Sequence, residues 1–76
     1  MNIKVLGGGC KNCERLLKAT KEAVENKGVD AEIEYITDIE KIMSYGIMST
    51  PALVIDEKVV ATGRVLKTKD IENCFL

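Results

Sequence analysis

The sequence predicts one α/β domain over residues 1–76, with a small mixed four-stranded sheet and helices on both of its faces. Three observations predict this class. Strand-like segments alternate with segments of helical spacing in the first part of the chain, which favours a parallel βαβ unit with a right-handed crossover. The last two strand-like segments are separated only by a tight turn, which is typical of an antiparallel hairpin. A further helical segment follows, so the predicted order is β-α-β-α-β-β-α.

The first half of the chain carries the clearest periodicity. Asn2–Leu6 alternates apolar and polar residues and runs into the glycines Gly7–Gly9, which predicts a strand and a tight turn. Lys11–Lys27 then has helical spacing, and Gly28 suits the left-handed position that ends a helix. The apolar face of this helix is expected to contain Cys13, Leu16, Leu17, Thr20, Ala23 and Val24.

The next two elements are a strand and a short helix. Ala31–Ile36 alternates again and predicts a second strand. Asp38–Tyr45 is expected to form a helix that Thr37 or Asp38 caps and Gly46 ends. Its apolar positions Ile39, Ile42 and Met43 have i, i+3, i+4 spacing, and Met43 is assigned to the core.

The third and fourth strands follow Pro51, the sole proline of the sequence. Ala52–Ile55 is continuously apolar, as in a strand that is buried on both faces. Asp56–Lys58 is predicted to turn the chain into a strand at Val59–Thr62, which Gly63 ends.

The C-terminal segment "KTKDIENCFL" has helical character. Thr68 is expected to cap this helix, with Ile71 and either Cys74 or Phe75 turned inward. Cys74 is interpreted as a small core residue, because free cysteines are among the most buried residues.

Composition excludes several classes of function. The formal charge is −1 with both signs intermixed, and the three aromatic residues are too few for a base-stacking surface, so no nucleic-acid partner is expected. The absence of histidine removes Cys–His nucleophile pairs and His-containing zinc sites. No stretch has the length of a membrane span or the pattern of a signal peptide, so we expect a cytoplasmic protein without a membrane partner. The chain is also expected to be a monomer.

The motif "GGGCKNC" places two cysteines at the predicted junction of strand and helix. Cys10 falls at the N-cap or first turn, where unpaired N–H groups and the helix dipole favour an anion, so the pKa of Cys10 is expected to lie below that of free cysteine. Lys11 strengthens this effect and Glu14 opposes it. Cys13 lies one turn further on, on the apolar face, and is expected to be shielded.

An exposed acidic thiol with a shielded thiol behind it suits thiol–disulfide exchange. Cys10 would attack a substrate disulfide, and Cys13 would then resolve the mixed disulfide. The glycines keep side chains off the approach to Cys10. In a reducing cytosol, a close cysteine pair of this kind is catalytic or metal-binding more often than structural.

With these features on one chain, the sequence resembles the thioredoxin/glutaredoxin superfamily, and most of all its small redox-active disulfide proteins, over nearly its whole length. "CKNC" matches the family's active-site CxxC, and "YGIMSTPALVI" resembles the segment that leads to a cis-proline and a buried strand. The resemblance implies a minimal thioredoxin fold and a thiol-disulfide oxidoreductase, with Cys10 as the nucleophile and Cys13 as the resolving thiol. No cofactor is expected beyond the redox-active Cys10–Cys13 disulfide, and no metal.

The resemblance also implies a substrate site and partners. Pro51 becomes the cis-proline, Thr50 presents its backbone to an extended substrate, and Met48 flanks the groove. The expected substrate-binding residues are Gly9, Lys11, Asn12, Met48, Thr50, Pro51 and Gly63. Expected partners are protein disulfides and an electron donor, either a reductase of the thioredoxin-reductase type or glutathione.

Several positions depart from the family pattern. The pair between the cysteines is Lys-Asn, neither the Gly-Pro of thioredoxin nor the Pro-Tyr of glutaredoxin. Gly9 stands where thioredoxin has tryptophan, and Lys4 stands where it has a buried acid. The acidic, glycine-rich glutathione motif of glutaredoxin is not apparent. These differences leave the reduction potential and the electron donor open.

Two other functions stay open at this point. A soft-metal carrier would bind Cu(I) through Cys10 and Cys13. Heavy-metal-associated domains, however, follow the order β-α-β-β-α-β and usually carry methionine two residues before the first cysteine, where this chain has Gly8. The other alternative is a thioredoxin-fold binding module without catalytic activity.

Overall fold

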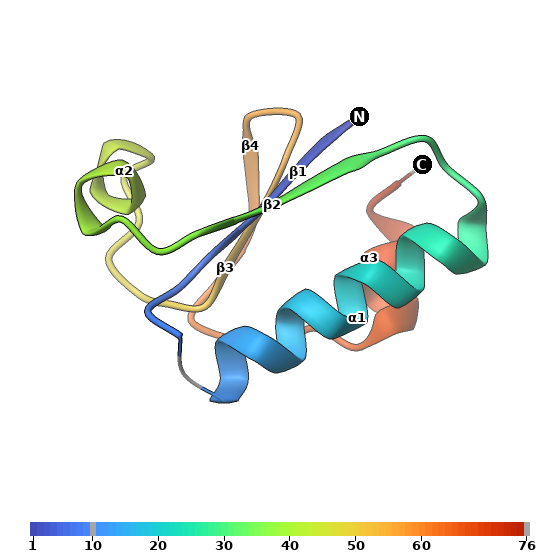
Figure 1. The fold of residues 1–76 in the computed structure, drawn as a ribbon, viewed down its shortest axis with the longest axis horizontal. Helices are drawn as coiled ribbons and strands as arrows, with labels where there is room; N and C mark the ends of the chain where they lie inside the picture. Colours follow the sequence, from blue (N-terminus) through green and yellow to red (C-terminus); the bar gives the residue numbers. More distant parts are fainter. Residues whose placement is uncertain (10, 76) are drawn as a thin grey trace.

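The computed structural model describes residues 1–9 and 11–75 (Figure 1). Its element order is the predicted β-α-β-α-β-β-α. The elements are β1 (Asn2–Leu6), α1 (Lys11–Lys27), β2 (Glu32–Ile36), α2 (Ile39–Ser44), β3 (Ala52–Ile55), β4 (Lys58–Thr62) and α3 (Thr68–Asn73). The expected strand at Ala31–Ile36 thus begins one residue later, and the expected helix at Asp38–Tyr45 is one residue shorter at each end.

The four strands form one mixed sheet in the order β2-β1-β3-β4. β1 and β2 run parallel and are joined through α1, which is the predicted βαβ unit. β3 pairs antiparallel with β1, and β4 pairs antiparallel with β3. The fold class read from the sequence, a minimal thioredoxin fold, is therefore confirmed.

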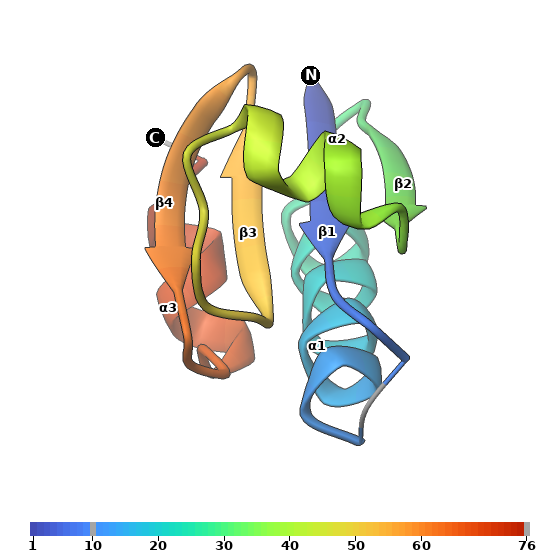
Figure 2. The same cartoon turned by 90° about the vertical axis from the view of Figure 1, so that its left-hand side faces the viewer.

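Helices lie on both faces of the sheet, as predicted. α1 and α3 lie together on one face, and α2 lies on the other, near the end of the sheet where β1 ends (Figures 1 and 2). The core is correspondingly divided. Leu53 and Ile55 of β3 belong to the cluster beneath α1 and α3, whereas Ala52 and Val54 belong to the cluster beneath α2. Every residue of β3 is buried, which confirms that this strand is covered on both faces.

α1 packs on the sheet through the predicted apolar stripe. Its buried residues are Cys13, Leu16, Thr20 and Ala23. The Thr20 hydroxyl lies inside this stripe and donates a 2.7 Å hydrogen bond to the Leu16 carbonyl, which satisfies the one polar side chain in the contact. Gly28 follows the helix with φ +62°, the left-handed conformation expected of it.

α2 differs from the prediction in its burial. Asp38 caps the helix by accepting a hydrogen bond from the Glu40 N–H, and Ile42 is buried. Ile39 and Met43, however, are 70% and 66% exposed, so the assignment of Met43 to the core was wrong. A helix of only six residues contacts the sheet through a narrow part of its surface. Ile42 lies in this contact, whereas Ile39 and Met43 lie beside it.

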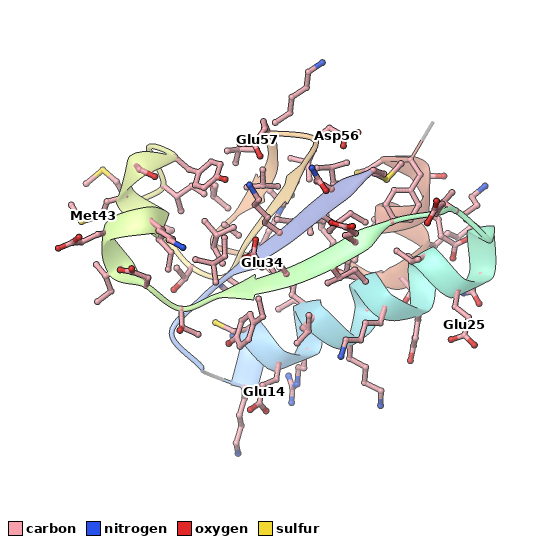
Figure 3. The ribbon with its side chains drawn as sticks, turned by 45° about the horizontal axis from the view of Figure 1, so that its top comes forward. Glu14, Glu25, Glu34, Met43, Asp56 and Glu57 are labelled. Carbon is pink, nitrogen blue, oxygen red and sulfur yellow. The ribbon has the colours of Figure 1, made fainter. Side chains whose placement is uncertain are left out.

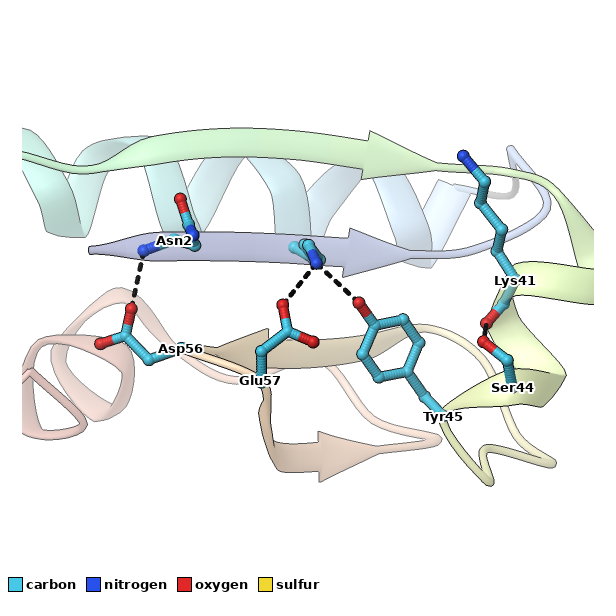
Figure 4. A network of polar contacts seen from close by, with 7 residues as sticks. Asn2, Lys41, Ser44, Tyr45, Asp56 and Glu57 are labelled. Atoms are coloured by element: carbon cyan, nitrogen blue, oxygen red, sulfur yellow. Dashed lines mark hydrogen bonds and ion pairs between the residues drawn. The ribbon is translucent and has the colours of Figure 1, made fainter.

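The hairpin turn is tighter than predicted. Asp56 and Glu57 both have positive φ, 49° and 68°, so they form a two-residue type I′ turn and β4 begins at Lys58. The Asp56 N–H donates to the Asn2 carbonyl, and the Asp56 carboxylate accepts from the Asn2 N–H at 2.8 Å (Figure 4). The turn is thereby attached to the first residue of β1.

α3 begins without the predicted threonine cap. Lys67 is the N-cap residue and makes no side-chain cap hydrogen bond, while the Thr68 hydroxyl donates instead to the Glu22 carboxylate on α1 at 3.2 Å. Ile71 is fully buried, as expected. Cys74 is partly buried against the core, so its assignment as a core residue is only partly correct.

Lys4 on β1 joins two separate segments of the chain. Its ammonium group donates to the Tyr45 hydroxyl and to the Glu57 carboxylate, each at 2.6 Å. Tyr45 ends α2 and Glu57 lies in the hairpin turn, so this one side chain attaches both to the central strand. The hydrogen bond to Glu57 raises the pKa of Lys4, and the same bond lowers the pKa of Glu57.

This cluster predicts a pH-dependent contribution to stability. Because the pKa of Glu57 is lower in the folded chain than its ordinary value of 4.5, its contribution is present above that value and is lost as pH falls through the folded-state pKa. Glu57→Gln should therefore lower the urea midpoint of unfolding at neutral pH, and the gap to wild type should close in acid. The exposed Glu32→Gln is the control. A gap that persists after Glu57 is protonated would contradict the assignment.

Candidate functional site

The expected site residues gather where β1 ends and β3 begins. Leu6 of β1 pairs with Ala52 of β3, and Ala52 pairs with Thr62 of β4. The chain positions just beyond these pairs are Gly7 after β1, Pro51 before β3 and Gly63 after β4. The Gly7 N–H donates to the Ile36 carbonyl at 3.0 Å, and the Gly63 N–H donates to the Pro51 carbonyl at 2.8 Å. The backbone around the site is therefore held by hydrogen bonds that continue the sheet.

The Thr50–Pro51 peptide bond is cis, the configuration that the family resemblance implies. Pro51 is buried, whereas Thr50 and Met48 are exposed in the loop that precedes it. Gly63 has φ +70°, and a Cβ atom built on it would lie 3.1 Å from the Ser49 Cβ. A side chain at position 63 would thus be strained and would crowd this loop, which explains glycine there.

The two cysteines differ in what the structure shows of them. Cys10 lies outside the described residues, so its expected place at the helix N-terminus stays a prediction. α1 begins at Lys11, and Cys13 lies inside its first turn with no exposed surface, shielded as the sequence predicts. Around them, Gly9, Lys11 and Asn12 are exposed, and Gly9 adopts φ +83° with open space beside it.

Gly7 lies directly against the side chain of Cys13. A Cβ atom built on Gly7 would overlap the Cys13 Sγ and would lie 2.8 Å from the Cys13 Cβ. The same built Cβ atom would lie 3.8 Å from Cε1 of the Tyr35 ring on β2. Sequence reasoning assigned the glycines to the approach to Cys10 and missed this contact, because strand register and helix placement are both needed to bring positions 7 and 13 together.

An apolar groove lies beside the loop that precedes Pro51. It has a volume of about 400 Å³, and its lining residues are Gly8, Ile39, Ile42, Met43, Ile47, Met48 and Thr50. Met48 is fully exposed, and Met43 points outward from α2 (Figure 3). Met48 was expected to flank a groove, but the contribution of α2 to its lining was missed, since Met43 was assigned to the core.

Lys4 lies on the far side of the sheet from Cys13. Ile3 and Val5, its neighbours on β1, belong to the cluster beneath α1, and adjacent strand residues point to opposite faces. The Lys4 ammonium correspondingly contacts Tyr45, next to α2. The side chain at the position of the family's buried acid therefore has a structural role here, attaching α2 and the hairpin to β1.

The sheet order, the helix that carries a buried second cysteine and the cis-proline loop together define a protein of the thioredoxin superfamily. The chain belongs to the family described as "Thioredoxin domain", whose model matches residues 1–76. It is 38% identical over 73 residues to a thioredoxin of Methanothermobacter thermautotrophicus, covering 96% of this chain and 95% of that protein. It is 33% identical over 71 residues to a thioredoxin of Methanocaldococcus jannaschii, covering 93% and 81%.

The element order also separates this fold from that of the metal carriers. In heavy-metal-associated domains a strand follows the second strand, whereas here α2 follows β2. Among the helices in the described part of the chain, none has the length and apolar character needed to cross a membrane.

The Tyr35 side chain, whose ring lies beside Gly7, provides a test of stability. Its hydroxyl is buried and has no hydrogen-bond partner among the described residues. Because an unpaired buried hydroxyl costs about 1–3 kcal/mol, Tyr35→Phe should leave the free energy of unfolding unchanged or raise it. Tyr45→Phe is the matched control and should lower it, since that hydroxyl accepts from Lys4. Urea unfolding measures both. A loss in Tyr35→Phe as large as in the control would show that the hydroxyl has a partner.

Proposed function

We propose that this protein is a thiol-disulfide oxidoreductase that exchanges electrons through Cys10 and Cys13, without a bound cofactor or metal. The observation that carries the proposal is the complete burial of Cys13 in the first turn of α1, three residues after a cysteine that directly precedes the helix in sequence. A resolving thiol needs this shielding, because it must react with the partner cysteine and not with outside disulfides. Membership of the thioredoxin family supports the same chemistry.

The proposed reaction has two steps. The Cys10 thiolate attacks one sulfur of a substrate disulfide, a mixed disulfide forms, and the released substrate thiolate takes up a proton. Cys13 then loses its proton and attacks the Cys10 sulfur, which closes the Cys10–Cys13 disulfide and releases the second substrate thiol. The substrate gains two electrons and two protons, and the protein dithiol loses them.

The first attacking thiol requires a low pKa, and the N-terminal end of α1 is the proposed cause. The 17 residues of α1 supply an aligned dipole whose positive end lies at Lys11. A cysteine immediately before this position would face unpaired N–H groups, which stabilise a thiolate. The exposed Lys11 ammonium adds to the effect, and Glu14 in the first turn opposes it.

The proposed substrate is a protein disulfide carried on an extended segment. Thr50 would present its backbone to that segment, while the groove that includes Met48 would receive an apolar side chain next to the disulfide. Gly9, Lys11, Asn12, Pro51 and Gly63 would form the remaining rim. None of the described residues that line the groove is charged, so apolar contact is the main attraction that they offer.

The proposed electron donor is a reductase of the thioredoxin-reductase type or glutathione, and the proposed compartment is the cytoplasm. Two relatives named thioredoxin support the protein-disulfide partner. The reduction potential of the Cys10–Cys13 couple would decide whether the chain acts as a reductant or an oxidant in its cell.

The reaction predicts different fates for the two cysteine variants. Wild type should accelerate the reduction of insulin disulfides by dithiothreitol, and Cys10→Ser should reduce the rate to background, since it removes the attacking thiol. Cys13→Ser should instead accumulate a covalent mixed disulfide with the substrate, visible by mass spectrometry. Cys74→Ser is the control and should behave as wild type. If Cys10→Ser traps substrate and Cys13→Ser does not, the two roles are reversed.

The groove predicts a substrate-binding defect in Met48→Glu. A carboxylate at this fully exposed position would lose hydration when an apolar side chain covers it, and it would not disturb the core. The KM for insulin should therefore rise several-fold with little change in kcat. Val59→Glu is the matched control, because Val59 is an exposed apolar residue on β4 outside the groove. Equal KM values in the two variants would remove the groove from the substrate site.

A further inference from the structure

We infer that Gly7 is a positioning residue for Cys13: the absence of a side chain at the end of β1 creates the space in which the resolving sulfur lies. This inference rests on the proposed function, because it concerns the thiol that closes the disulfide. It assigns a redox role to a glycine that lies outside the CxxC motif.

The contact between the two residues is direct and leaves no room for a methyl group. A Cβ atom on Gly7 would overlap the Cys13 Sγ, and it would lie 2.8 Å from the Cys13 Cβ. Rotation of the Cys13 side chain would relieve the first contact but not the second, because the Cβ position is fixed by the helix backbone. A side chain at position 7 must therefore displace the first turn of α1 or the end of β1.

Neither backbone is free to move. Gly7 donates its N–H to the Ile36 carbonyl and follows directly on Leu6, which is paired on both sides, with Ile36 and with Ala52. α1 is fixed by the buried stripe that continues from Cys13 through Leu16. Close packing on both sides makes the overlap costly and transmits it to the sulfur.

Gly7 also differs from the other glycines of its loop. Gly8 has no atom within 4 Å of a built Cβ and is not in the left-handed region, and Gly9 has open space but φ +83°. Gly7 is buried and has no positive φ, so backbone conformation does not explain glycine there. Glycine is explained instead by the Cys13 side chain, which occupies the space that a Cβ atom at position 7 would need. The Tyr35 ring, 3.8 Å from the same point, forms the adjacent wall of this space.

A displaced Cys13 should close the disulfide less readily. A disulfide requires a Cβ–Cβ separation of about 3.5–4.5 Å and a narrow dihedral range, so a forced shift at one cysteine disfavours the oxidised form. Gly7→Ala should thus raise the reduction potential of the couple and slow the release of substrate from the mixed disulfide, while Cys10 still attacks.

The test is equilibration of wild type, Gly7→Ala and Gly8→Ala in buffers of defined glutathione ratio, with the intramolecular disulfide quantified by acid trapping and mass spectrometry. The equilibrium constant for disulfide formation should fall at least about tenfold in Gly7→Ala, equivalent to about 30 mV for two electrons. Gly8→Ala should equal wild type in this equilibrium. A Gly7→Ala value equal to wild type, or an equal shift in both variants, would overturn the inference. Wild type that forms no disulfide at all would instead contradict the proposed function.

A second measurement applies if Gly7→Ala folds but is too unstable for that equilibration. Cys13→Gly removes both atoms that a methyl group at position 7 would meet. The urea midpoint of Gly7→Ala/Cys13→Gly should then equal that of Cys13→Gly alone, whereas Gly7→Ala in the native background should lower it clearly. An equal loss in both backgrounds would show that Gly7 serves the turn and not Cys13.

Discussion

The contact between the first turn of α1 and the end of β1 governs the rest of this structure. α1 buries Cys13 in the same stripe that holds the helix on the sheet, so one surface serves both packing and the proposed chemistry. The backbone of Gly7 allows that close approach, and its hydrogen bond to Ile36 fixes the approach to the β1–β2 pair. A chain of 76 residues buries a smaller share of its surface than a large domain does, so it has few buried contacts. The same contact must then often serve both packing and function.

Strand register then brings distant segments to the same place. The antiparallel pairings of β1 with β3 and of β3 with β4 set Pro51 beside Gly7 and Gly63 beside Pro51. The loop before β3 and the flank of α2 form the apolar groove next to them. Lys4 supports this arrangement from the α2 face of the sheet, because it holds both the end of α2 and the hairpin turn. The groove thus depends on a polar cluster that lies outside it.

Local signals in the sequence predicted most of the fold. Alternation in Asn2–Leu6, the helical stripe of α1 and the continuous apolar run of β3 each depend on a period or a run that a sequence displays directly. What sequence alone could not give depends on contacts between distant residues. The exposure of Met43 follows from how a short helix meets the sheet, and the Gly7–Cys13 contact follows from register and helix placement together. The same holds for Lys4, whose partners lie 41 and 53 residues away in the chain.

The spacing of the cysteines has a consequence for the way in which such a protein would carry electrons. A bridge between Cys10 and Cys13 closes a loop of four residues, and in the chain-entropy model so short a loop stabilises the folded state by only about 2 kcal/mol. The dithiol and disulfide forms can therefore share one fold. For the proposed couple, the reduction potential would then depend mainly on the local geometry around the two sulfurs. In the proposed mechanism, control of the couple would therefore lie with the groups packed around Cys13, and Gly7 is one of them, because a Cβ atom there would overlap the Cys13 side chain.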